Sequence, residues 1–383
     1  MLFSSVNFLY YFLPILLAVY FLVSNKYKNL VLLIFSLLFY FLGEPKYIVV
    51  LLLSCFINYY LSKVMDKSDK GRGLYLVIIV LYNVIQLLIF KYIDFFIGNV
   101  NNLFGINISF WYIVMPIGIS FFTFQALGYV IDVYNRKHLP ADSLIDFMTY
   151  ICLFPQLVAG PIVRYRDVYK ELGNRSCSYD KFSSGVSRFI IGLAKKVLIA
   201  NVLGEAAVRI IEISVVSSWV KPFLYTLQIY FDFSGYSDMA IGLGLMFGFH
   251  FLENFNYPLI ASSVTDFWRR WHISLSSWFR DYVYIPMGGN RVGKLKWFRN
   301  IFVVWFLTGF WHGASWNFII WGLYFLVILV IEKLFLKEFL ERTKVFKYVY
   351  TLLVVIVSFL IFSVNSTNEI MIELKNMFFI SDI

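Results

Sequence analysis

His312 carries the strongest chemical signal in this sequence. It is the only histidine or charged side chain in an apolar run that extends over residues 301–331. An ionisable group at membrane depth is costly, so its presence there indicates a functional site. Because a neutral imidazole accepts a proton near pH 7, His312 is suited to act as a general base. The alternative is a neutral core histidine that bonds to a neighbouring helix.

The residues around His312 read LTGFWHGASWN over 307–317. The run 301–331 is longer than the roughly 20 residues that one straight helix needs to cross a bilayer. Gly309 and Gly313 permit a close approach of two helices or a break in the helix. We therefore expect an irregular helical segment here. The side chains that are available to shape a substrate pocket beside the histidine are Trp311, Ser315, Trp316 and Asn317.

A second candidate segment, residues 263–286, reads SVTDFWRRWHISLSSWFRDYVYIP. Ser263 and Asp266 have the spacing of a capping box, which predicts that a helix starts here. Asp266 and Arg270 can pair across one helical turn. On a continuous helix, His272 would lie near Arg269 and Ser276. Another face would carry the apolar side chains Trp268, Trp271, Leu275 and Trp278.

Two interpretations of this second segment remain open. An amphipathic helix at the membrane interface, with an aromatic belt and basic headgroup contacts, would explain its tryptophans and arginines. It explains the other polar residues less well, so we also treat the segment as part of a catalytic site. His272 is then a second catalytic candidate. The substrate-binding candidates are Asp266, Arg269 and Asp281.

Other patterns carry less chemical information. The Gly-rich basic loop 288–296 could hold a phosphate group, but it lacks Walker spacing and is better explained as a cytoplasmic basic loop. The chain has no GxSxG, HExxH, GxGxxG or CxxC motif. A histidine base that acts on a hydroxyl of the substrate needs no protein nucleophile. The four histidines have no ligand spacing, so we expect no metal site. We also expect no bound cofactor.

The composition defines the class of protein that must position these residues. Of the 383 residues, 60% are hydrophobic and only 15% are charged, whereas a soluble domain has about 25% charged residues. This excludes an ordinary soluble enzyme and predicts an all-α polytopic membrane protein. The net charge of +10 arises from basic loops between apolar runs. We assign these loops to anionic lipid headgroups rather than to nucleic acid.

The apolar runs give the expected order of membrane helices. Four clear spans lie at 6–23, 29–42, 47–61 and 74–93. Gly and Pro interrupt the run 95–131, and Gly residues interrupt the run 223–251. The run 147–157 is short, and the run 186–213 is amphipathic. Residues 164–181 form a basic polar loop. The last strong spans are 301–331 and 348–364. We expect one membrane domain over 1–383, with about nine to eleven helices, several of them broken or re-entrant.

The loop charges predict the orientation in the membrane. The first loop contains Lys26 and Lys28, and the third contains four basic residues, whereas the second has only Lys46 beside Glu44. The positive-inside rule places the first and third loops in the cytoplasm. The N-terminus is therefore expected outside.

The two histidine segments also resemble a known family. DFWRRWHISLSSWFRDYVYIP at 266–286 and LTGFWHGASWNFIIWG at 307–322 resemble the membrane-bound O-acyltransferase family. Three further segments are similar to its branch that O-acetylates alginate and other bacterial envelope polysaccharides. They are MLFSSVNFLYYFLP at 1–14, PIGISFFTFQALGYVIDVY at 116–134 and LFPQLVAGPIVRY at 153–165.

The resemblance implies a helical ring around a central tunnel or funnel, in the plasma membrane of a bacterium. It implies a thioester donor, generally acetyl-CoA, on the cytoplasmic side and an acceptor hydroxyl of an envelope polysaccharide on the outer side. By the same likeness, His312 would deprotonate or orient that hydroxyl, and His272 would support the site or the donor path. An outward-facing esterase-like partner of the SGNH type would complete delivery to the polymer.

Several alternatives remain at this stage. Members of the branch commonly continue beyond the equivalent of Ile383 through further helices, so closure of the ring and activity of this polypeptide alone are open. A related enzyme would transfer D-alanine to teichoic acid. A transporter or flippase could also use broken helices and an intramembrane histidine. An inactive scaffold for the esterase-like partner is the remaining candidate.

Overall fold

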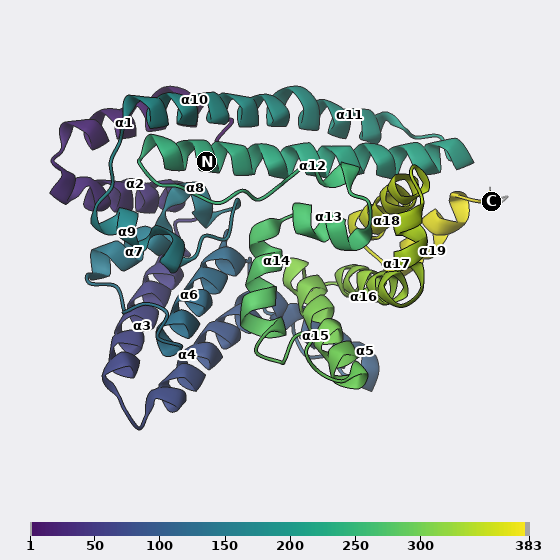
Figure 1. Ribbon diagram of the computed structural model, residues 1–383, viewed down its shortest axis with the longest axis horizontal. Coiled ribbons are helices and arrows are strands. Elements are labelled where there is room, and N and C mark those ends of the chain that lie inside the picture. The colour runs from purple at the N-terminus through teal and green to yellow at the C-terminus, as the bar shows by residue number, and fades with distance from the viewer. Residues whose placement is uncertain (1, 380–383) are drawn as a thin grey trace. The chain divides into compact units, whose positions relative to one another are not determined.

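The computed structural model describes residues 2–379, and in these residues every regular element is a helix. Figure 1 shows the helices in chain order. The chain divides into two compact units. The first comprises Met1–Leu193 and Tyr236–Leu252, and the second comprises Ala194–Gly235 and Glu253–Ile383. The predicted all-α class is confirmed.

The first unit contains the N-terminal helices. The four clear spans of the sequence are all helical, although the fourth continues without interruption to Phe104. Helices α3, α4 and α6 lie side by side (Figure 1). The helices of this unit are η1 (Phe8–Phe12), α1 (Leu13–Leu22), η2 (Asn25–Tyr27), α2 (Lys28–Gly43), α3 (Ile48–Lys67), α4 (Arg72–Leu87), η3 (Leu88–Tyr92), α5 (Ile93–Phe104), α6 (Ile119–Tyr134), α7 (Leu144–Cys152), α8 (Phe154–Leu157), α9 (Tyr165–Gly173) and α10 (Tyr179–Ala194).

The break predicted within 95–131 is present. Residues 105–118 form no regular helix, and α6 begins only after Gly118. Gly118 has a φ of 77°, and a Cβ atom there would collide with the carbonyl oxygen of Leu157, so glycine is required at this position. The prediction of a polar loop at 164–181 is wrong, because α9 and the start of α10 occupy much of this stretch. The side chains of Tyr165, Val168 and Leu172 are buried, which explains why this polar stretch folds as a helix.

The second unit holds both histidine segments. Helix α12 begins in this unit and ends in the first one. It is continuous as far as Met246, so the glycines of the run 223–251 do not interrupt it there. The helices of this unit are η4 (Lys195–Ala200), α11 (Asn201–Arg209), α12 (Val215–Met246), η5 (Pro258–Ile260), α13 (Val264–Arg270), α14 (Ile273–Phe279), η6 (Arg280–Tyr284), α15 (Lys294–His312), α16 (Trp316–Ile331), η7 (Glu332–Leu336), α17 (Lys337–Arg342), α18 (Phe346–Ser363) and α19 (Thr367–Asn376).

Helical runs long enough and apolar enough to cross a membrane lie in both units. They are Asn25–Gly43, Ile48–Lys67, Arg72–Phe104, Trp316–Arg342 and Phe346–Ser363, and two shorter apolar helices are Phe8–Leu22 and Ile119–Tyr134. In the five long runs, at most 44% of the most apolar window is buried inside the folded chain, as expected where lipid replaces water. The shorter helix Ile119–Tyr134 is instead mostly buried. The chain is therefore a multi-pass membrane protein. The expected total of about nine to eleven membrane helices, the outside position of the N-terminus and the central tunnel stay predictions.

Candidate active site

His312 lies at the junction of two helices. It is the last residue of α15, and Gly313 follows in an extended conformation before α16 begins at Trp316. The predicted break in the run 301–331 is thus confirmed at Gly313. The predicted close helix approach is also present, because a Cβ atom on Gly309 would collide with the carbonyl oxygen of Phe318. These two glycines hold the end of α15 against the start of α16.

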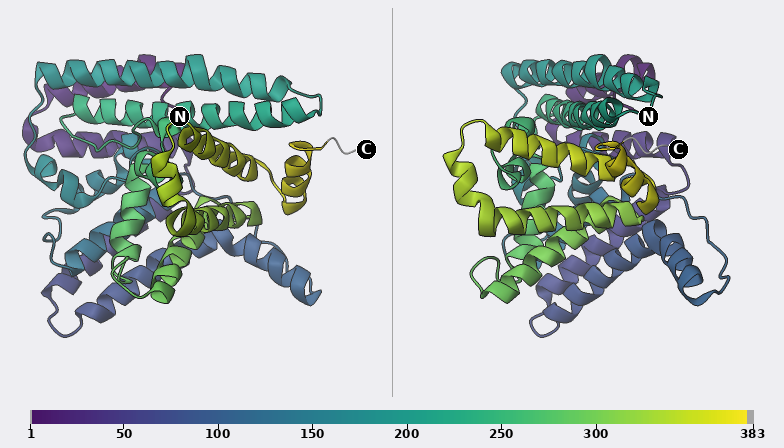
Figure 2. Two further views of the ribbon diagram at one scale, coloured as in Figure 1. Left: turned by 45° about the vertical axis from the view of Figure 1, so that its right-hand side comes forward. Right: turned by 90° about the vertical axis from the view of Figure 1, so that its right-hand side faces the viewer.

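The imidazole of His312 is surrounded by aromatic rings from three elements. Its centroid lies 4.9 Å from the ring of Trp311, 4.8 Å from that of Trp321 and 5.2 Å from that of Phe362. Helices α16 and α18, which carry the last two rings, lie side by side (Figure 2). The negative end of the α15 dipole would stabilise a positive charge on this imidazole.

The predicted pocket residues lie at the start of α16. Ser315 is the N-cap of this helix, and its side chain makes no capping hydrogen bond. The indole of Trp316 is half-exposed. Asn317 is buried, and its Nδ2 donates to the carbonyl oxygen of Val364 at 2.8 Å, so this amide fixes the end of α18. The N–H groups of the first turn of α16 form the positive end of a helix dipole close to His312 along the chain.

His272 lies between α13 and α14 in an unusual backbone conformation. Its φ of 43° and ψ of 54° are left-handed, which costs a residue with a Cβ atom roughly 1–3 kcal/mol. The side chain is only 1% exposed. Burial lowers the pKa of His272 to about 3, so its imidazole is neutral at physiological pH.

The structure brings the two histidine segments together through one indole. The ring of Trp311 lies 6.0 Å from the imidazole of His272 and 4.9 Å from that of His312. The ring of Phe233 packs edge-on against His272 at 4.7 Å. Both imidazoles therefore border the same aromatic cluster in the second unit, although they are 40 residues apart in the sequence.

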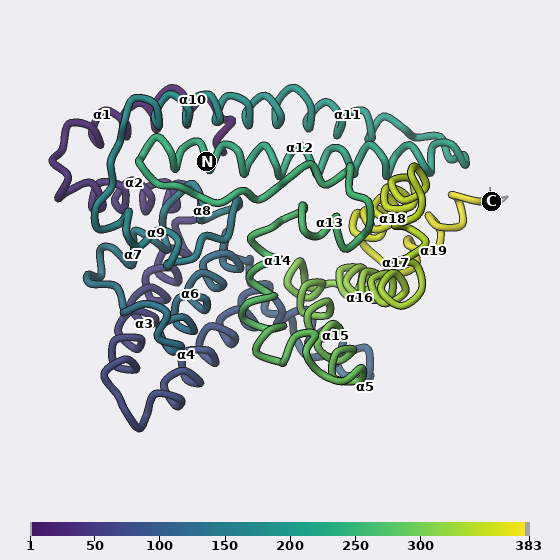
Figure 3. The backbone as a smooth tube through the Cα atoms, in the orientation of Figure 1, coloured from purple at the N-terminus to yellow at the C-terminus, as the bar shows by residue number. Residues whose placement is uncertain are grey.

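The interpretation of 263–286 as a continuous interfacial helix is wrong. The chain changes direction at His272, so α13 and α14 are separate helices (Figure 3). Trp268, Trp271 and Trp278 are 9% exposed or less. They do not form an exposed aromatic belt. Trp268 instead packs at 4.8 Å against Trp305 and at 4.9 Å against Phe325, which places α13 in the core of the unit.

The predicted charged candidates have mostly local partners. The predicted helix start is confirmed, because the backbone N–H of Asp266 donates to Ser263 Oγ at 3.0 Å. The Asp266 carboxylate accepts from the backbone N–H of Ser262, one residue before the position that a capping box uses. The Asp266–Arg270 ion pair is also confirmed at 3.0 Å. Asp281 pairs with Arg280 at 2.7 Å, and Arg269 is exposed. These contacts all lie within residues 262–286, and substrate binding by Asp266, Arg269 and Asp281 stays a prediction.

Asn254 and Ser274 belong to the site, although the sequence analysis missed them. Asn254 is fully buried, and its Oδ1 lies 3.1 Å from Nδ1 of His272 and 2.9 Å from Oγ of Ser274. Asn254 is 18 residues from His272 along the chain. A loop, η5 and α13 separate the two, so they do not share a helix. The only signal was a polar residue in the loop that follows the apolar run 223–251.

Glu332 is a further missed residue, and it supports α13. This carboxylate is 4% exposed and accepts hydrogen bonds from the backbone N–H groups of Val264 and Thr265, at 2.7 and 2.9 Å, and from Oγ1 of Thr265 at 2.7 Å. These N–H groups are among those that a helix start leaves without an internal partner. Glu332 thus anchors the helix that leads to His272.

The Glu332→Gln variant is expected to lose about 1–3 kcal/mol of stability. The amide NH2 of glutamine would face a backbone N–H group, which leaves one buried donor without an acceptor. Thermal unfolding in detergent measures the loss. The matched control is Glu338→Gln, because the side chain of Glu338 is 86% exposed and its pair with Arg342 is long, at 3.9 Å. Equal unfolding temperatures for both variants would contradict the anchoring role.

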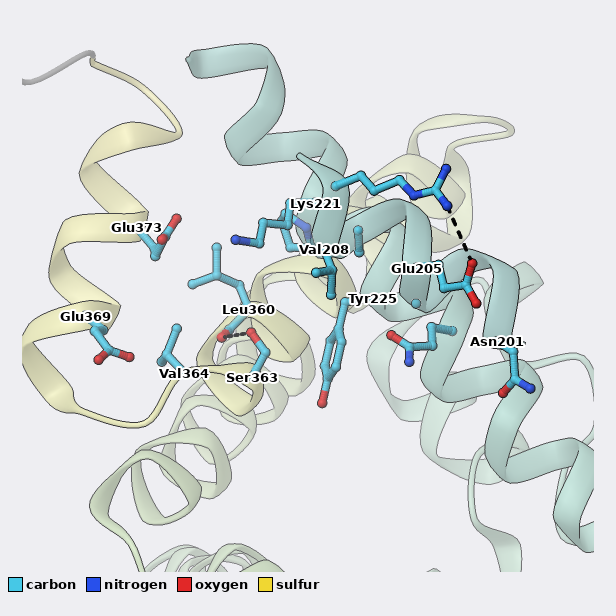
Figure 4. A pocket seen from close by; sticks show the side chains of 15 residues that line it. Asn201, Glu205, Val208, Lys221, Tyr225, Leu360, Ser363, Val364, Glu369 and Glu373 are labelled. Atoms are coloured by element: carbon cyan, nitrogen blue, oxygen red, sulfur yellow. Dashed lines mark hydrogen bonds and ion pairs between the residues drawn. The ribbon is translucent and has the colours of Figure 1, made fainter. Parts of the chain in front are cut away.

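A cavity of about 1010 Å³ lies between α11, α12, α18 and α19. Figure 4 shows its lining, which includes Tyr225, Lys221, Ser363 and Glu373. Neither histidine lines it. The end of α18 is common to both, since Phe362 contacts His312 and the next residue, Ser363, lines the cavity. Within residues 2–379 no group of three or more His, Cys, Asp or Glu side chains could hold a metal ion.

Comparison with known proteins identifies the family. The model of the MBOAT, membrane-bound O-acyltransferase family, matches residues 136–372, which include both histidine segments. The probable alginate O-acetylase AlgI of Pseudomonas aeruginosa is 40% identical over 373 residues, which cover 94% of this chain and 72% of that protein. The peptidoglycan O-acetyltransferase of Helicobacter pylori is 36% identical, over 84% of this chain and 68% of that protein.

A more distant likeness covers less of the chain. The teichoic acid D-alanyltransferase of Bacillus subtilis is 30% identical over 58% of this chain and 60% of its own length. The predicted resemblance to the polysaccharide O-acetylating branch is thus supported by longer and more similar matches. The chain belongs to the membrane-bound O-acyltransferase family.

Proposed function

We propose that this protein transfers an acetyl group from a cytoplasmic thioester to a hydroxyl of an envelope polysaccharide. One observation carries the proposal. His312, the only histidine or charged residue of its apolar run, lies where the C-terminus of α15 meets the N-terminus of α16. The relatives named as O-acetylases of alginate and peptidoglycan support acetyl as the group and a polysaccharide as the acceptor. Acetyl-CoA is the proposed donor.

The arrangement suits attack of a hydroxyl on a thioester. A nitrogen of the neutral His312 imidazole takes the proton of the acceptor hydroxyl while the oxygen of that hydroxyl bonds to the acyl carbon. The carbonyl oxygen then becomes an oxyanion, which the first-turn N–H groups of α16 would stabilise. When this intermediate collapses, the C–S bond breaks, and the ester and a thiolate are released. The imidazolium returns its proton to the thiolate, which restores the enzyme.

The aromatic cluster gives His312 its environment. The rings of Trp311, Trp321 and Phe362 restrict the orientation of the imidazole and cover part of it. A bound substrate that covered the remaining part would exclude water, which strengthens the electrostatic interactions and limits hydrolysis of the thioester. Transfer across the bilayer, an N-terminus outside and an SGNH-type esterase-like partner that receives or delivers the acetyl group belong to the same proposal.

Cells that lack this gene are expected to carry less ester-bound acetate on their envelope polysaccharide, and the 383-residue chain is expected to restore it. Mild alkali releases the ester groups, and chromatography separates acetate from D-alanine. Restored acetate with unchanged D-alanine supports the proposal.

Restored D-alanine would instead support the second candidate, D-alanyl transfer to teichoic acid, which the more distant relative suggests. Restoration of neither ester by a chain that reaches the membrane would overturn the proposed activity of this polypeptide alone.

A further inference from the structure

The amide of Asn254 is built into the core of the second unit beside His272. Its side chain is fully buried. Its Oδ1 lies within hydrogen-bond distance of three groups: Nδ1 of His272 at 3.1 Å, the backbone N of Ser274 at 3.2 Å and Oγ of Ser274 at 2.9 Å. The backbone oxygen of Asn254 also accepts from the N–H of Ile273 at 3.0 Å. Asn254 therefore binds the imidazole and the two residues that follow His272 in the chain.

These contacts determine which nitrogen of His272 carries the proton. The backbone N–H of Ser274 can only donate, so the side-chain atom of Asn254 that faces it is the oxygen. An amide oxygen can only accept, so Nδ1 of His272 must be the donor in the third contact. A neutral imidazole has one N–H group. Nε2 therefore carries the lone pair.

The hydroxyl of Ser274 does not change this assignment. Its distance to Oδ1 of Asn254 is 2.9 Å, whereas its distance to Nδ1 of His272 is 3.4 Å. The shorter and better hydrogen bond is the one to the amide oxygen. Ser274 thus supports Asn254 rather than replacing it as the partner of the imidazole.

The other nitrogen of the ring has no such partner. Nε2 of His272 is buried and has no hydrogen-bond partner among the described residues. A buried acceptor without a partner is unfavourable, and the left-handed backbone of His272 is a second unfavourable feature at the same residue. The partnerless nitrogen is explained if it receives a hydrogen bond from a group that the chain itself does not supply. The left-handed backbone places the imidazole where the bonds of Asn254 hold it.

We propose that Asn254 is a positioning residue, which holds His272 in the Nδ1–H tautomer and so keeps Nε2 as a hydrogen-bond acceptor inside the acyl-transfer site. During turnover, the group that donates a hydrogen bond to Nε2 is a hydroxyl, from the acceptor sugar or from water. The tautomer itself follows from the contacts of Asn254. Only its use in catalysis rests on the proposed function.

The tautomer can be measured by nitrogen NMR of protein labelled with ¹⁵N-histidine in lipid nanodiscs. The expected wild-type signature of His272 is a pyrrole-like Nδ1 and a pyridine-like Nε2. Asn254→Asp keeps an acceptor oxygen opposite Nδ1, so its Nδ1 is expected to stay protonated. Asn254→Leu removes the acceptor and is expected to shift protons to Nε2. Ser274→Ala keeps Asn254 and is expected to retain the wild-type signature.

Acetyl transfer provides a second readout. Asn254→Leu is expected to lower kcat by about 10- to 100-fold, through misplacement of the imidazole, with little change in the KM for the thioester. Asn254→Asp is expected to retain more activity than Asn254→Leu. The matched control is Asn300→Leu, since Asn300 is also fully buried in this unit but donates to the carbonyl oxygens of Met287 and Gly289. It is expected to lose stability and to leave the His272 signature unchanged.

The proposal is overturned if Asn254→Leu retains a pyridine-like Nε2, or if Ser274→Ala moves the proton. If Asn254→Leu does not accumulate, the Asp and Ala variants still decide the tautomer. A wild-type signature in a protein without acetyl transfer would leave the tautomer assignment standing and count against the proposed function instead.

Discussion

The His312→Ala variant is expected to transfer acetyl groups about 10²- to 10⁴-fold more slowly than the wild type, which is the contribution that a general base usually makes. Its membrane level is expected to stay the same, because the imidazole is only partly buried. The measurement is the initial rate of radiolabelled acetyl transfer from the thioester in isolated membranes, divided by the amount of protein detected by immunoblot. His312→Gln, which retains a polar side chain but no base, is expected to be similarly slow.

His250→Ala provides the matched control for that loss. His250 follows the end of α12 with an exposed side chain, and its backbone N–H donates to a carboxylate oxygen of Glu171 at 3.0 Å. Its removal is expected to leave the rate within about twofold, since surface substitutions away from special features have small effects. A His312→Ala protein as active as His250→Ala would show that His312 is structural, and the proposed mechanism would be wrong.

The Gly309→Ala variant is expected to lose about 1–3 kcal/mol of stability, or more, because it overpacks a contact between two backbones. A Cβ atom at this position would collide with the carbonyl oxygen of Phe318 and lie 3.3 Å from Cα of Gly322. Neither can move unless α15 and α16 separate. Since His312 ends α15, separation would also displace the base, so activity is expected to fall with stability. Thermal unfolding in detergent and the acetyl-transfer rate measure the two effects.

Gly73→Ala tests whether the change in side chain alone explains this loss. Gly73 lies in α4, and nothing lies within 4 Å of a Cβ atom added there. Alanine is favoured over glycine in a helix by about 1 kcal/mol. The same substitution is therefore expected to be neutral or stabilising at residue 73 and destabilising at residue 309. An equal loss of stability at both positions would mean that the close approach of α15 and α16 does not contribute to stability.

The composition and the apolar runs were sufficient to predict the class of the fold. The helices of the first four spans formed where the sequence predicted them, because a run of apolar residues in lipid can satisfy its backbone groups only within a helix. The break at Gly313 was likewise predictable, since the run 301–331 exceeds one span and contains glycine. The same local logic failed for residues 164–181, where buried side chains fold a polar sequence into α9.

The sequence by itself thus determined the membrane class, the family motifs and the two histidines. Only the tertiary structure decided how the histidines are arranged. A continuous helix through 263–286 satisfied every local rule, but burial of Trp268 and Trp271 and the hydrogen bonds of Asn254 favour the left-handed turn at His272. Glu332 contacts α13, and Asn254 contacts His272, from other parts of the chain. Such contacts leave no periodic trace in a sequence, because they depend on which helices pack together and not on residue spacing.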